Sequence, residues 1–266
     1  MSFGDEIMAS GHALSVHRKS GGRIVIVGLD GEPRWSDLWA GLPWIVQPDE
    51  SRAGASAVQN GPQCRPYIAY PFNRDIGCRY SGWRARDHLG EIRFTAEETD
   101  FAARATAGLE DFILIEPGVP AQSNPNKQWG RAKWQALADI LTGEGRVLVQ
   151  VGAPGTDTLA GVKLIETPSF RHGAAVLARA AHSILPEGGL HHAAGALHLP
   201  AVVLFGGAVD VEATGYPWHT NVVDDGPLSP CGAWSPCDHC ADIWAKLSPE
   251  HVAGLLPQQD LLRRQA

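Results

Sequence analysis

Residues 186–197, with the sequence PEGGLHHAAGAL, contain the strongest candidate for a binding site in this chain. An acid, two glycines and a histidine pair stand directly before a run of small residues, where a predicted strand ends and a helix begins. Glycines leave amide N–H groups free at a helix N-terminus, where the helix dipole favours an anion. We therefore expect Gly188 and Gly189 to offer N–H donors and His192 to donate to a phosphate oxygen. An ordinary strand–helix turn with a surface histidine pair is the alternative.

Residues 123–129, SNPNKQW, form a second candidate of the same kind. They follow the predicted strand over 112–118 and precede a predicted helix, which places them on the side of an open α/β sheet where ligands bind. Lys127 supplies a point charge suited to a phosphate, and Ser123 begins the loop. The alternative is an exposed lysine near the start of a helix.

A third candidate, Gly4-Asp5, precedes the predicted helix over residues 6–18. A carboxylate in a glycine-containing loop at a helix start can act as a general base or can cap the helix. The residue types alone leave both roles open, and capping is the commoner of the two.

The loop over residues 74–86, RDIGCRYSGWRAR, interleaves arginine with aromatic side chains. This mixture suits an anionic acceptor, a sugar stacked on tryptophan, or a single nucleic-acid strand. A solvated loop that packs its aromatic rings inward is the alternative. The candidate acceptor-binding residues are His12, Arg74, Arg79, Trp83 and Arg84.

Cys231, Cys237 and Cys240, with His239 between the last two, are spaced closely enough to suggest a zinc site. Against this, His239 stands between two of the cysteines, where we expect it to be cramped. The five cysteines are an odd number, and in a reducing compartment they are not expected to form a disulfide framework. We therefore favour buried or partly exposed thiols over zinc and predict no metal site.

Short apolar runs alternate with helical patterns along most of the chain. Such alternation predicts parallel strands joined by helical crossovers, and the nearly all-apolar strands predict a sheet covered on both faces. Strands are expected over residues 22–29, 66–70, 112–118, 146–152, 162–166, 182–187 and 201–207. Helices are expected over 95–108 (capped by Thr95 and Glu98), 129–141, 169–181 and 189–197, and loops over 48–65 and 71–93.

The composition is that of an ordinary globular protein, with 44% hydrophobic and 19% charged residues in a chain of 266. The net charge of −7 argues against a broad basic surface for nucleic acid. No apolar run approaches the roughly 20 residues that span a bilayer, and the N-terminus lacks the pattern of a signal peptide. We therefore expect a cytoplasmic protein without a transmembrane segment.

Together and in this order, the motifs resemble the heptosyltransferase-like glycosyltransferases of family 9. The matching elements are Gly4-Asp5, Lys127-Gln128-Trp129, the run from Glu187 to His192, Pro200, Phe205-Gly206, and the cysteines before residues 247–256. The resemblance implies an α/β GT-B fold, with two Rossmann-like domains over residues 1–108 and 109–266 facing across a cleft. A helix over 248–265 is expected to pack back on the first domain. The N-terminal domain is expected to be short, and either lacks its first strand or has that edge covered by a neighbouring chain.

The resemblance also implies roles for the matched residues. Asp5 would deprotonate an acceptor hydroxyl and so invert the anomeric carbon. Lys127 and His192 would neutralise a diphosphate leaving group without a metal ion. Glu187 stands where the family has aspartate, which moves the carboxylate that would contact the donor sugar. The implied donor-binding residues are Ser123, Lys127, Glu187, Gly188, Gly189 and His192.

The implied activity is metal-independent, inverting sugar transfer from a nucleoside-diphosphate donor to a hydroxyl acceptor, with no cofactor. Family habit suggests a heptose or another hexose-type sugar, and the arginine-rich loop suggests an anionic glycan or other hydroxyl acceptor. One alternative is a degenerate protein of the same fold that binds nucleotide or glycan without turnover. The other is a nucleotide-sugar epimerase or hydrolase.

Overall fold

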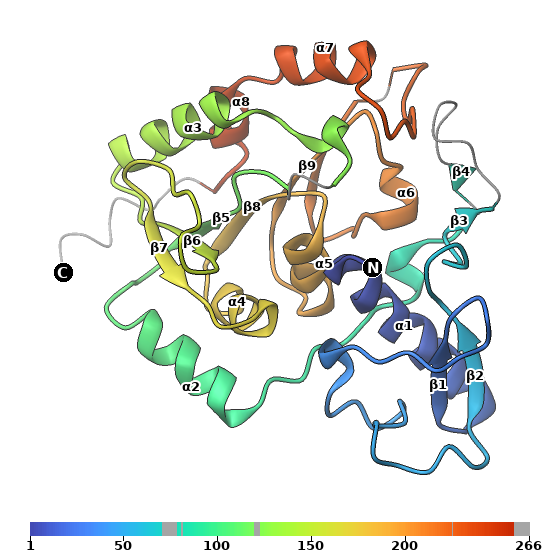
Figure 1. Cartoon of the computed structure of the whole chain (residues 1–266). Helices are drawn as coiled ribbons and strands as arrows, with labels where there is room; N and C mark the ends of the chain where they lie inside the picture. The colour runs from blue at the N-terminus through green and yellow to red at the C-terminus, as the bar shows by residue number, and fades with distance from the viewer. Residues whose placement is uncertain (71–78, 81, 120–122, 225, 258–266) are drawn as a thin grey trace.

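The computed structural model describes every residue except 71–78, 81, 120–122, 225 and 258–266 (Figure 1). At its centre lies a six-stranded parallel sheet with the strand order β10-β9-β8-β5-β6-β7. The chain winds outward from β5 to one edge and then from β8 to the other, which is the doubly wound arrangement. The predicted α/β class with a parallel sheet is therefore confirmed. The strands are β5 (Ile113–Ile115), β6 (Leu148–Gly152), β7 (Lys163–Glu166), β8 (His182–Pro186), β9 (Val202–Gly206) and β10 (Thr220–Val223).

Alternating side chains along the central strands build a hydrophobic layer on each face of this sheet. On β5, Leu114 joins one core cluster, whereas Ile113 and Ile115 join another. The first cluster reaches α4 and α5, the second reaches α3 and α8, and Figure 1 shows these helix pairs on opposite sides of the sheet. The helices are α3 (Arg131–Gly143), α4 (Phe170–Leu177), α5 (Gly189–Ala196), α6 (Val211–Thr214), α7 (Asp238–Lys246) and α8 (Pro249–Gly254).

The first part of the chain is smaller than a complete Rossmann-like domain. Within its described residues the expected sheet is reduced to two parallel strands, β1 and β2, beside an antiparallel pair, β3 and β4. The sequence of β2 lies within 48–65, where Gly, Pro and Asp predicted a loop, and the pairing with β1 overrides that local signal. The elements are α1 (Phe3–Ser20), β1 (Ile24–Val27), β2 (Ser56–Gln59), β3 (Ile68–Ala69), β4 (Arg79–Tyr80) and α2 (Ala96–Ala105).

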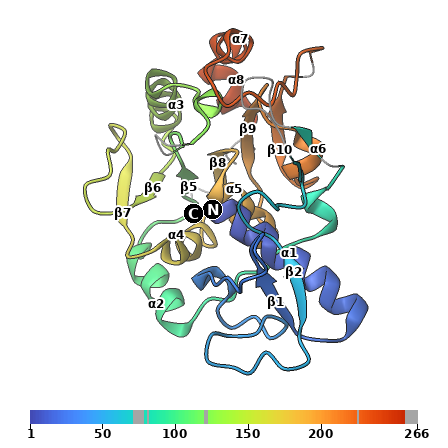
Figure 2. The ribbon, with the colours of Figure 1, turned by 45° about the vertical axis from the view of Figure 1, so that its right-hand side comes forward.

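Two helix pairs join the first part of the chain to the second (Figure 2). Helix α1 crosses α5 at Gly4, where an added Cβ would lie 2.5 Å from Cδ2 of His192. Helix α2 begins with the predicted capping box of Thr95 and Glu98, and it packs on α4. There Arg171 of α4 donates to Glu98 in a buried ion pair, with Nη2 and Oε2 2.8 Å apart. The division of the chain at residues 108 and 109 stays a prediction.

The C-terminal helix packs differently from the expectation. Val252 of α8 and the following Leu256 lie in the cluster that contains Trp134 and Leu137 of α3. The described part of the expected helix therefore packs on α3 beside the large sheet, because Val252 and Leu256 join the apolar residues of α3. The rest of the predicted 248–265 helix falls mainly outside the described residues. Among the described helices, none combines the length and apolar character required to cross a bilayer.

Candidate functional site

The turn after β8 has the geometry that its sequence predicts. Strand β8 ends at Pro186, Glu187 follows, and α5 begins at Gly189 with Gly188 at its N-cap position. The alternative of a surface histidine pair is wrong, because His191 is fully buried and His192 is 2% exposed. The turn therefore faces the interior between α5, α1 and the loop that carries Lys127.

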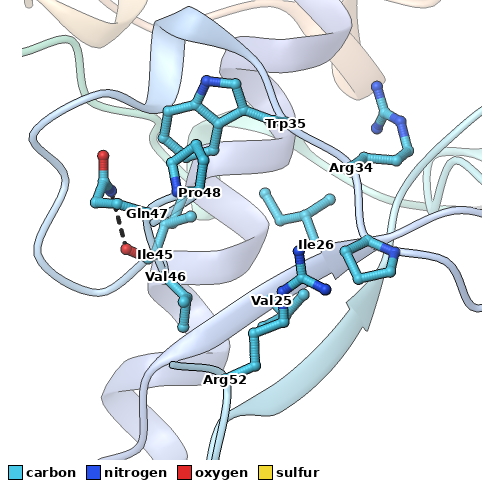
Figure 3. Close-up of a pocket in the computed structure, with 10 residues that line it drawn as sticks. Val25, Ile26, Arg34, Trp35, Ile45, Val46, Gln47, Pro48 and Arg52 are labelled. Carbon is cyan, nitrogen blue, oxygen red and sulfur yellow. Dashed lines mark hydrogen bonds between the residues drawn. The ribbon is translucent and has the colours of Figure 1, made fainter. Parts of the chain in front are cut away.

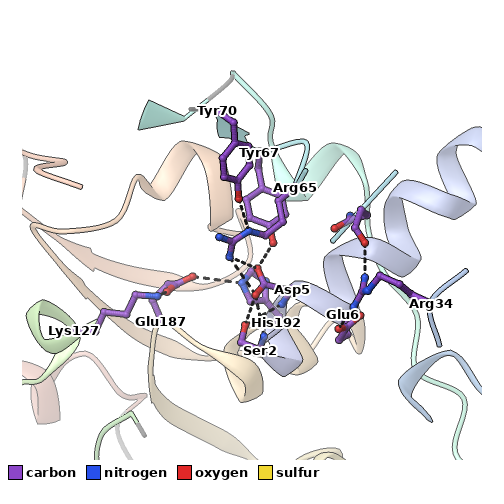
Figure 4. Close-up of polar contacts among 11 residues, drawn as sticks. Ser2, Asp5, Glu6, Arg34, Arg65, Tyr67, Tyr70, Lys127, Glu187 and His192 are labelled. Atoms are coloured by element: carbon purple, nitrogen blue, oxygen red, sulfur yellow. Dashed lines mark hydrogen bonds and ion pairs between the residues drawn. The ribbon is translucent and has the colours of Figure 1, made fainter. Parts of the chain in front are cut away.

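Lys127, Glu187 and His192 come together in one polar cluster (Figure 4). The Lys127 ammonium donates to Oε2 of Glu187, and His192 Nε2 lies 3.4 Å from Oε1 of the same carboxylate. His192 Nδ1 is 2.9 Å from the Tyr216 hydroxyl. With Nε2–H directed at Glu187, the Tyr216 hydroxyl donates to Nδ1, so both ring nitrogens have a partner. The sequence predicted that the first three residues share a site; Tyr216 carried no motif.

Glu187 is an ionised carboxylate in this cluster. Burial raises its pKa, but the Lys127 charge and the His192 hydrogen bond outweigh burial and hold the pKa well below the usual value. The neighbouring His191 has its pKa lowered well below the usual value, chiefly by burial, and stays neutral. Glu187, His191 and His192 also have the spacing of a metal-binding triad. Because the Lys127 ammonium already neutralises Glu187, we assign no metal there.

This cluster lies at the switch point of the large sheet. Lys127 belongs to the short 3₁₀ helix η3 (Pro125–Lys127) in the connection after β5, and Glu187 directly follows β8. Strands β5 and β8 are neighbours from which the chain winds in opposite directions. Ligands of doubly wound proteins bind outside the carboxyl ends of the strands at this point. Ser123 is half-buried at the start of the same connection.

Asp5 is held in the first turn of α1 by several donors (Figure 4). Its side chain completes a capping box with Ser2, whose N–H lies 3.0 Å from Asp5 Oδ2. Arg65 Nη1 is 3.3 Å from Oδ1, and the Tyr67 hydroxyl also donates to Oδ1. The capping role is therefore observed. The role of Asp5 as a base stays a prediction.

The electrostatic environment of Asp5 favours the ionised form. Burial raises its pKa, but the Arg65 charge and the hydrogen bonds from Tyr67 and Ser2 lower it below the usual value. Burial and the neighbouring Asp5 charge raise the pKa of Tyr67 well above its usual value. Asp5 is thus ionised near neutral pH. The buried Tyr67 hydroxyl already donates a hydrogen bond to its Oδ1.

The packing of α1 on α5 brings Asp5 next to the cluster of Lys127, Glu187 and His192. Gly4, the residue before Asp5, contacts His192 through the close approach already described, and its added Cβ would lie 3.5 Å from the Gly188 carbonyl oxygen. Phe3 stacks on Phe170 with ring centroids 4.2 Å apart, beside Gly189. The first turn of α1 therefore lies over the start of α5, and all three predicted motifs meet at one place.

The proposed acceptor residues are only partly described. Trp83 stacks on His88 with centroids 3.8 Å apart and meets His12 edge-on at 5.2 Å, so its ring packs inward as the alternative interpretation expected. Arg84 is exposed and lies 3.9 Å from Glu212. Arg74 lies outside the described residues, and Arg79 is described only as part of β4. The role of His12, Arg74, Arg79, Trp83 and Arg84 in acceptor binding stays a prediction.

Two pockets lie outside this cluster, and the larger one borders the loop that carries Lys127. The smaller, of about 70 Å³, is lined in the first part of the chain by residues such as Val25, Arg34, Trp35 and Arg52 (Figure 3). Ligand pockets for molecules of drug size span roughly 300–1,000 Å³, so this one is too small for a sugar nucleotide. The larger, of about 400 Å³, lies between η3, α3 and α7. Neither pocket is lined by Asp5, Glu187 or His192.

Several residues of the site had no sequence signal. Arg65 and Tyr67 lie in the loop and turn just before β3, and the local sequence pattern says nothing about their tertiary contact with Asp5. Glu116 directly follows β5, and its buried Oε2 has no partner among the described residues. Burial raises the pKa of Glu116 to about 8. Its position in the run FILIEPG, at the end of a predicted strand, is the one signal that could have drawn attention to it.

Comparison with known proteins gives one family match. A sequence model described as "Glycosyltransferase family 9 (heptosyltransferase)" matches residues 79–226, which is more than half of the chain. No curated protein sequence is significantly similar to the chain.

Two solved structures support the fold. A glycosyl transferase family 9 structure from Veillonella parvula is 14% identical, covers 96% of this chain and 93% of its own, and has a TM-score of 0.63. The iron-containing dodecameric glycosyltransferase TibC from enterotoxigenic E. coli is 14% identical, covers 96% of this chain and 72% of its own, and has a TM-score of 0.61. The E. coli ADP-heptose heptosyltransferase II is 18% identical over 62% of this chain, with a TM-score of 0.46, and the match spans about half (52%) of that structure.

Proposed function

Because the chain belongs to glycosyltransferase family 9, we propose that it transfers a sugar from a nucleoside-diphosphate donor to a hydroxyl acceptor. The observation that carries the proposal is the meeting of Lys127, Glu187 and His192 at the carboxyl ends of β5 and β8, the switch point of a doubly wound sheet.

The donor's diphosphate would bind beside Lys127. In the structure the Lys127 ammonium is neutralised by Glu187, and the negative charge of a diphosphate would compete with Glu187 for this ammonium. We propose that Lys127 turns to the phosphates, while His192 keeps Glu187 in place and Glu187 accepts hydrogen bonds from hydroxyl groups of the donor. A fixed cation beside the leaving group stabilises the charge that develops as the bond to the sugar breaks. No divalent ion is needed for this step.

Asp5 is our proposed base on the acceptor side. The acceptor hydroxyl would take the place that the Tyr67 hydroxyl holds at Asp5 Oδ1. As the acceptor oxygen bonds to the anomeric carbon, its proton passes to Asp5 and the bond to the diphosphate breaks on the opposite side, which inverts the centre. The low pKa of Asp5 makes it a weak base in the resting state, and separating Arg65 and Tyr67 from it would raise its basicity.

An ADP-linked heptose is the first donor to test. One structure of TibC, 16% identical over 80% of this chain with a TM-score of 0.51, is a complex with ADP-D-beta-D-heptose. Few loop residues change donor choice on this fold, so UDP- and GDP-linked hexoses belong in the same panel.

The experiment measures two products from each donor. The full chain is incubated with the sugar nucleotide, with and without a panel of neutral and phosphorylated sugar acceptors. Released nucleoside diphosphate and glycosylated acceptor are quantified by mass spectrometry. Acceptor-dependent release with an equal amount of glycosylated acceptor is the expected result. Release that does not depend on acceptor indicates a hydrolase, and a sugar nucleotide of altered stereochemistry indicates an epimerase.

A non-catalytic role is the second candidate, and one observation favours it. Asp5 is engaged by Ser2, Arg65 and Tyr67 at once, so the proposed base is not free in the structure. A protein that binds a nucleotide or glycan without turnover needs no free base. In the same experiment such a protein would bind the sugar nucleotide and leave it unchanged with every acceptor.

A further inference from the structure

Four side chains with metal-binding atoms meet at the start of α7. The sulfurs of Cys231, Cys237 and Cys240 and a ring nitrogen of His239 all lie within 4.8 Å of one another. The sulfurs of Cys231 and Cys240 are 3.3 Å apart. The sequence-based objection that His239 would be cramped is wrong, because the first turn of α7 directs its ring toward the sulfurs. Three sulfurs and one imidazole are a common ligand set for a four-coordinate structural metal.

The histidine is already oriented as metal-bound histidines are. Its Nε2 faces Asp224 Oδ2 at 3.6 Å, whereas its buried Nδ1 has no hydrogen-bond partner among the described residues. Asp224 is itself fixed, since Ser229 Oγ and the Gly226 N–H donate to Oδ2 at 2.7 and 3.1 Å. Histidines that bind a metal through one nitrogen usually donate from the other to such a carboxylate.

The cysteines are also held in place by the backbone. Cys237 stands at the N-cap of α7, and its N–H donates to Oδ1 of Asn126 at 3.0 Å. The Cys231 N–H donates to the Gly207 carbonyl oxygen at 2.9 Å, which ties the other end of the loop to β9. The position of Cys237 at a helix N-terminus favours the thiolate, which is the form of cysteine that binds a metal.

We propose that Cys231, Cys237, Cys240 and His239 Nδ1 bind one transition-metal ion in a tetrahedral site, with Asp224 orienting the histidine. The ligand set is that of zinc, and iron also accepts three thiolates and an imidazole. The site is remote from the Glu187 cluster in sequence and depends on none of its residues.

The ion would stabilise the loop that supports Lys127. Asn126 of η3 donates from Nδ2 to the carbonyl oxygens of Ala233 and Ser235 at 2.9 and 2.8 Å, and its Oδ1 accepts from the Cys237 N–H at 3.0 Å. The segment between Cys231 and Cys237 therefore closes on η3, which carries Lys127. This positioning role rests on the proposed donor site, whereas the metal site itself does not.

Elemental analysis of the purified full chain tests the site without any assay of activity. The expected content is about one zinc or one iron ion per chain, and the element found identifies the ion. Cys64→Ser is the matched control, because Cys64 is a free cysteine in the first part of the chain and outside the cluster. It should keep the ion, whereas Cys231→Ser and the milder His239→Asn should reduce the content at least ~10-fold, since each removes one of four ligands.

Replacement of the ion by cobalt(II) gives a second readout on the wild type itself, so the result does not depend on whether a ligand variant folds. Tetrahedral thiolate coordination of cobalt(II) produces intense visible absorption, which the wild type and Cys64→Ser should show. The proposal is overturned if the wild type, prepared in reducing and metal-supplemented medium, holds neither zinc nor iron. It is also overturned if a Cys231–Cys240 disulfide is found by mass in place of an ion. Metal binding without any effect of Cys231→Ser on nucleotide affinity would leave the site in place and refute only its role at Lys127.

Discussion

Gly4→Ala tests the helix contact that brings Asp5 to the cluster of Lys127, Glu187 and His192. Gly4 is where α1 crosses α5, and an added Cβ would lie 2.5 Å from Cδ2 of His192, closer than real Cβ contacts allow. The His192 ring cannot turn away cheaply, because it contacts both Tyr216 and Glu187. The methyl group must therefore separate the helices or break one of those contacts.

The expected loss of stability follows from three effects. Overpacking a close contact costs about 1–3 kcal/mol, and losing one buried hydrogen bond of His192 costs about 0.5–1.5 kcal/mol. Alanine is the better helix former by about 0.8–1 kcal/mol, which offsets part of the cost. The free energy of unfolding should fall by about 1–3 kcal/mol, and the midpoint of thermal unfolding by about 3–10 °C for a chain of this size.

Urea and thermal denaturation of the variant and the wild type measure this difference. Gly143→Ala is the matched control, because Gly143 ends α3 and no atom lies within 4 Å of its added Cβ. The control should be neutral or gain a few tenths of a kcal/mol. If Gly4→Ala behaves like Gly143→Ala, the helices do not meet as described and the reasoning that joins Asp5 to His192 fails.

Three further predictions concern Asp5, Glu116 and the metal requirement. If Asp5 is the base, Asp5→Asn should keep the affinity for nucleotide but lower the rate of transfer at least ~10²-fold at a temperature where both proteins are folded; a near wild-type rate would leave Asp5 as a cap. Folding raises the pKa of Glu116 to about 8, so the folded protein keeps a proton that the unfolded chain releases above about pH 4.5, and stability falls as pH rises between these values. Glu116→Gln removes this titration, so its stability relative to the wild type should rise as pH rises from 4.5 to 8, by about 1.4 kcal/mol for each pKa unit that folding shifts. Urea denaturation measures the difference, and parallel pH profiles would contradict the assignment. Nucleoside diphosphate should bind equally well with and without added Mg²⁺ by calorimetry, and a gain of tenfold or more on adding it would refute metal-independent donor binding.

Much of the large sheet could be predicted from the sequence, because its strands are short apolar runs between amphipathic helices. The run over 182–187 became β8, which is one residue shorter at its end, and the run over 201–207 became β9, which is one residue shorter at each end. Strand β2 could not be predicted in this way. Its sequence SAVQ has two polar residues and lies between loop signals, and it is a strand only because β1 pairs with it.

The site residues can be divided in the same way, into those that the sequence predicts and those that it does not. Lys127, Glu187 and His192 could be predicted because they follow strand ends whose place in the fold determines where the side chains meet. Arg65, Tyr67 and Tyr216 could not, since each is brought to the site by a long-range contact with no local pattern. The metal-binding cluster was judged from spacing alone, and spacing does not show that the first turn of a helix brings His239 to the sulfurs.

Calorimetric titration of ADP into the wild type and Lys127→Ala tests the central claim, that this cluster binds a nucleoside diphosphate. The variant should bind ADP about 5- to 150-fold more weakly, as expected for the loss of a charge-assisted hydrogen bond of about 1–3 kcal/mol, with adenosine affinity unchanged. Because the variant leaves Glu187 without its cation, Lys127→Ala/Glu187→Gln is measured beside it, and the exposed Lys163→Ala serves as the control. The control should bind ADP as the wild type does. Equal ADP affinity in all four proteins, or an equal loss for ADP and adenosine in Lys127→Ala, would contradict the account.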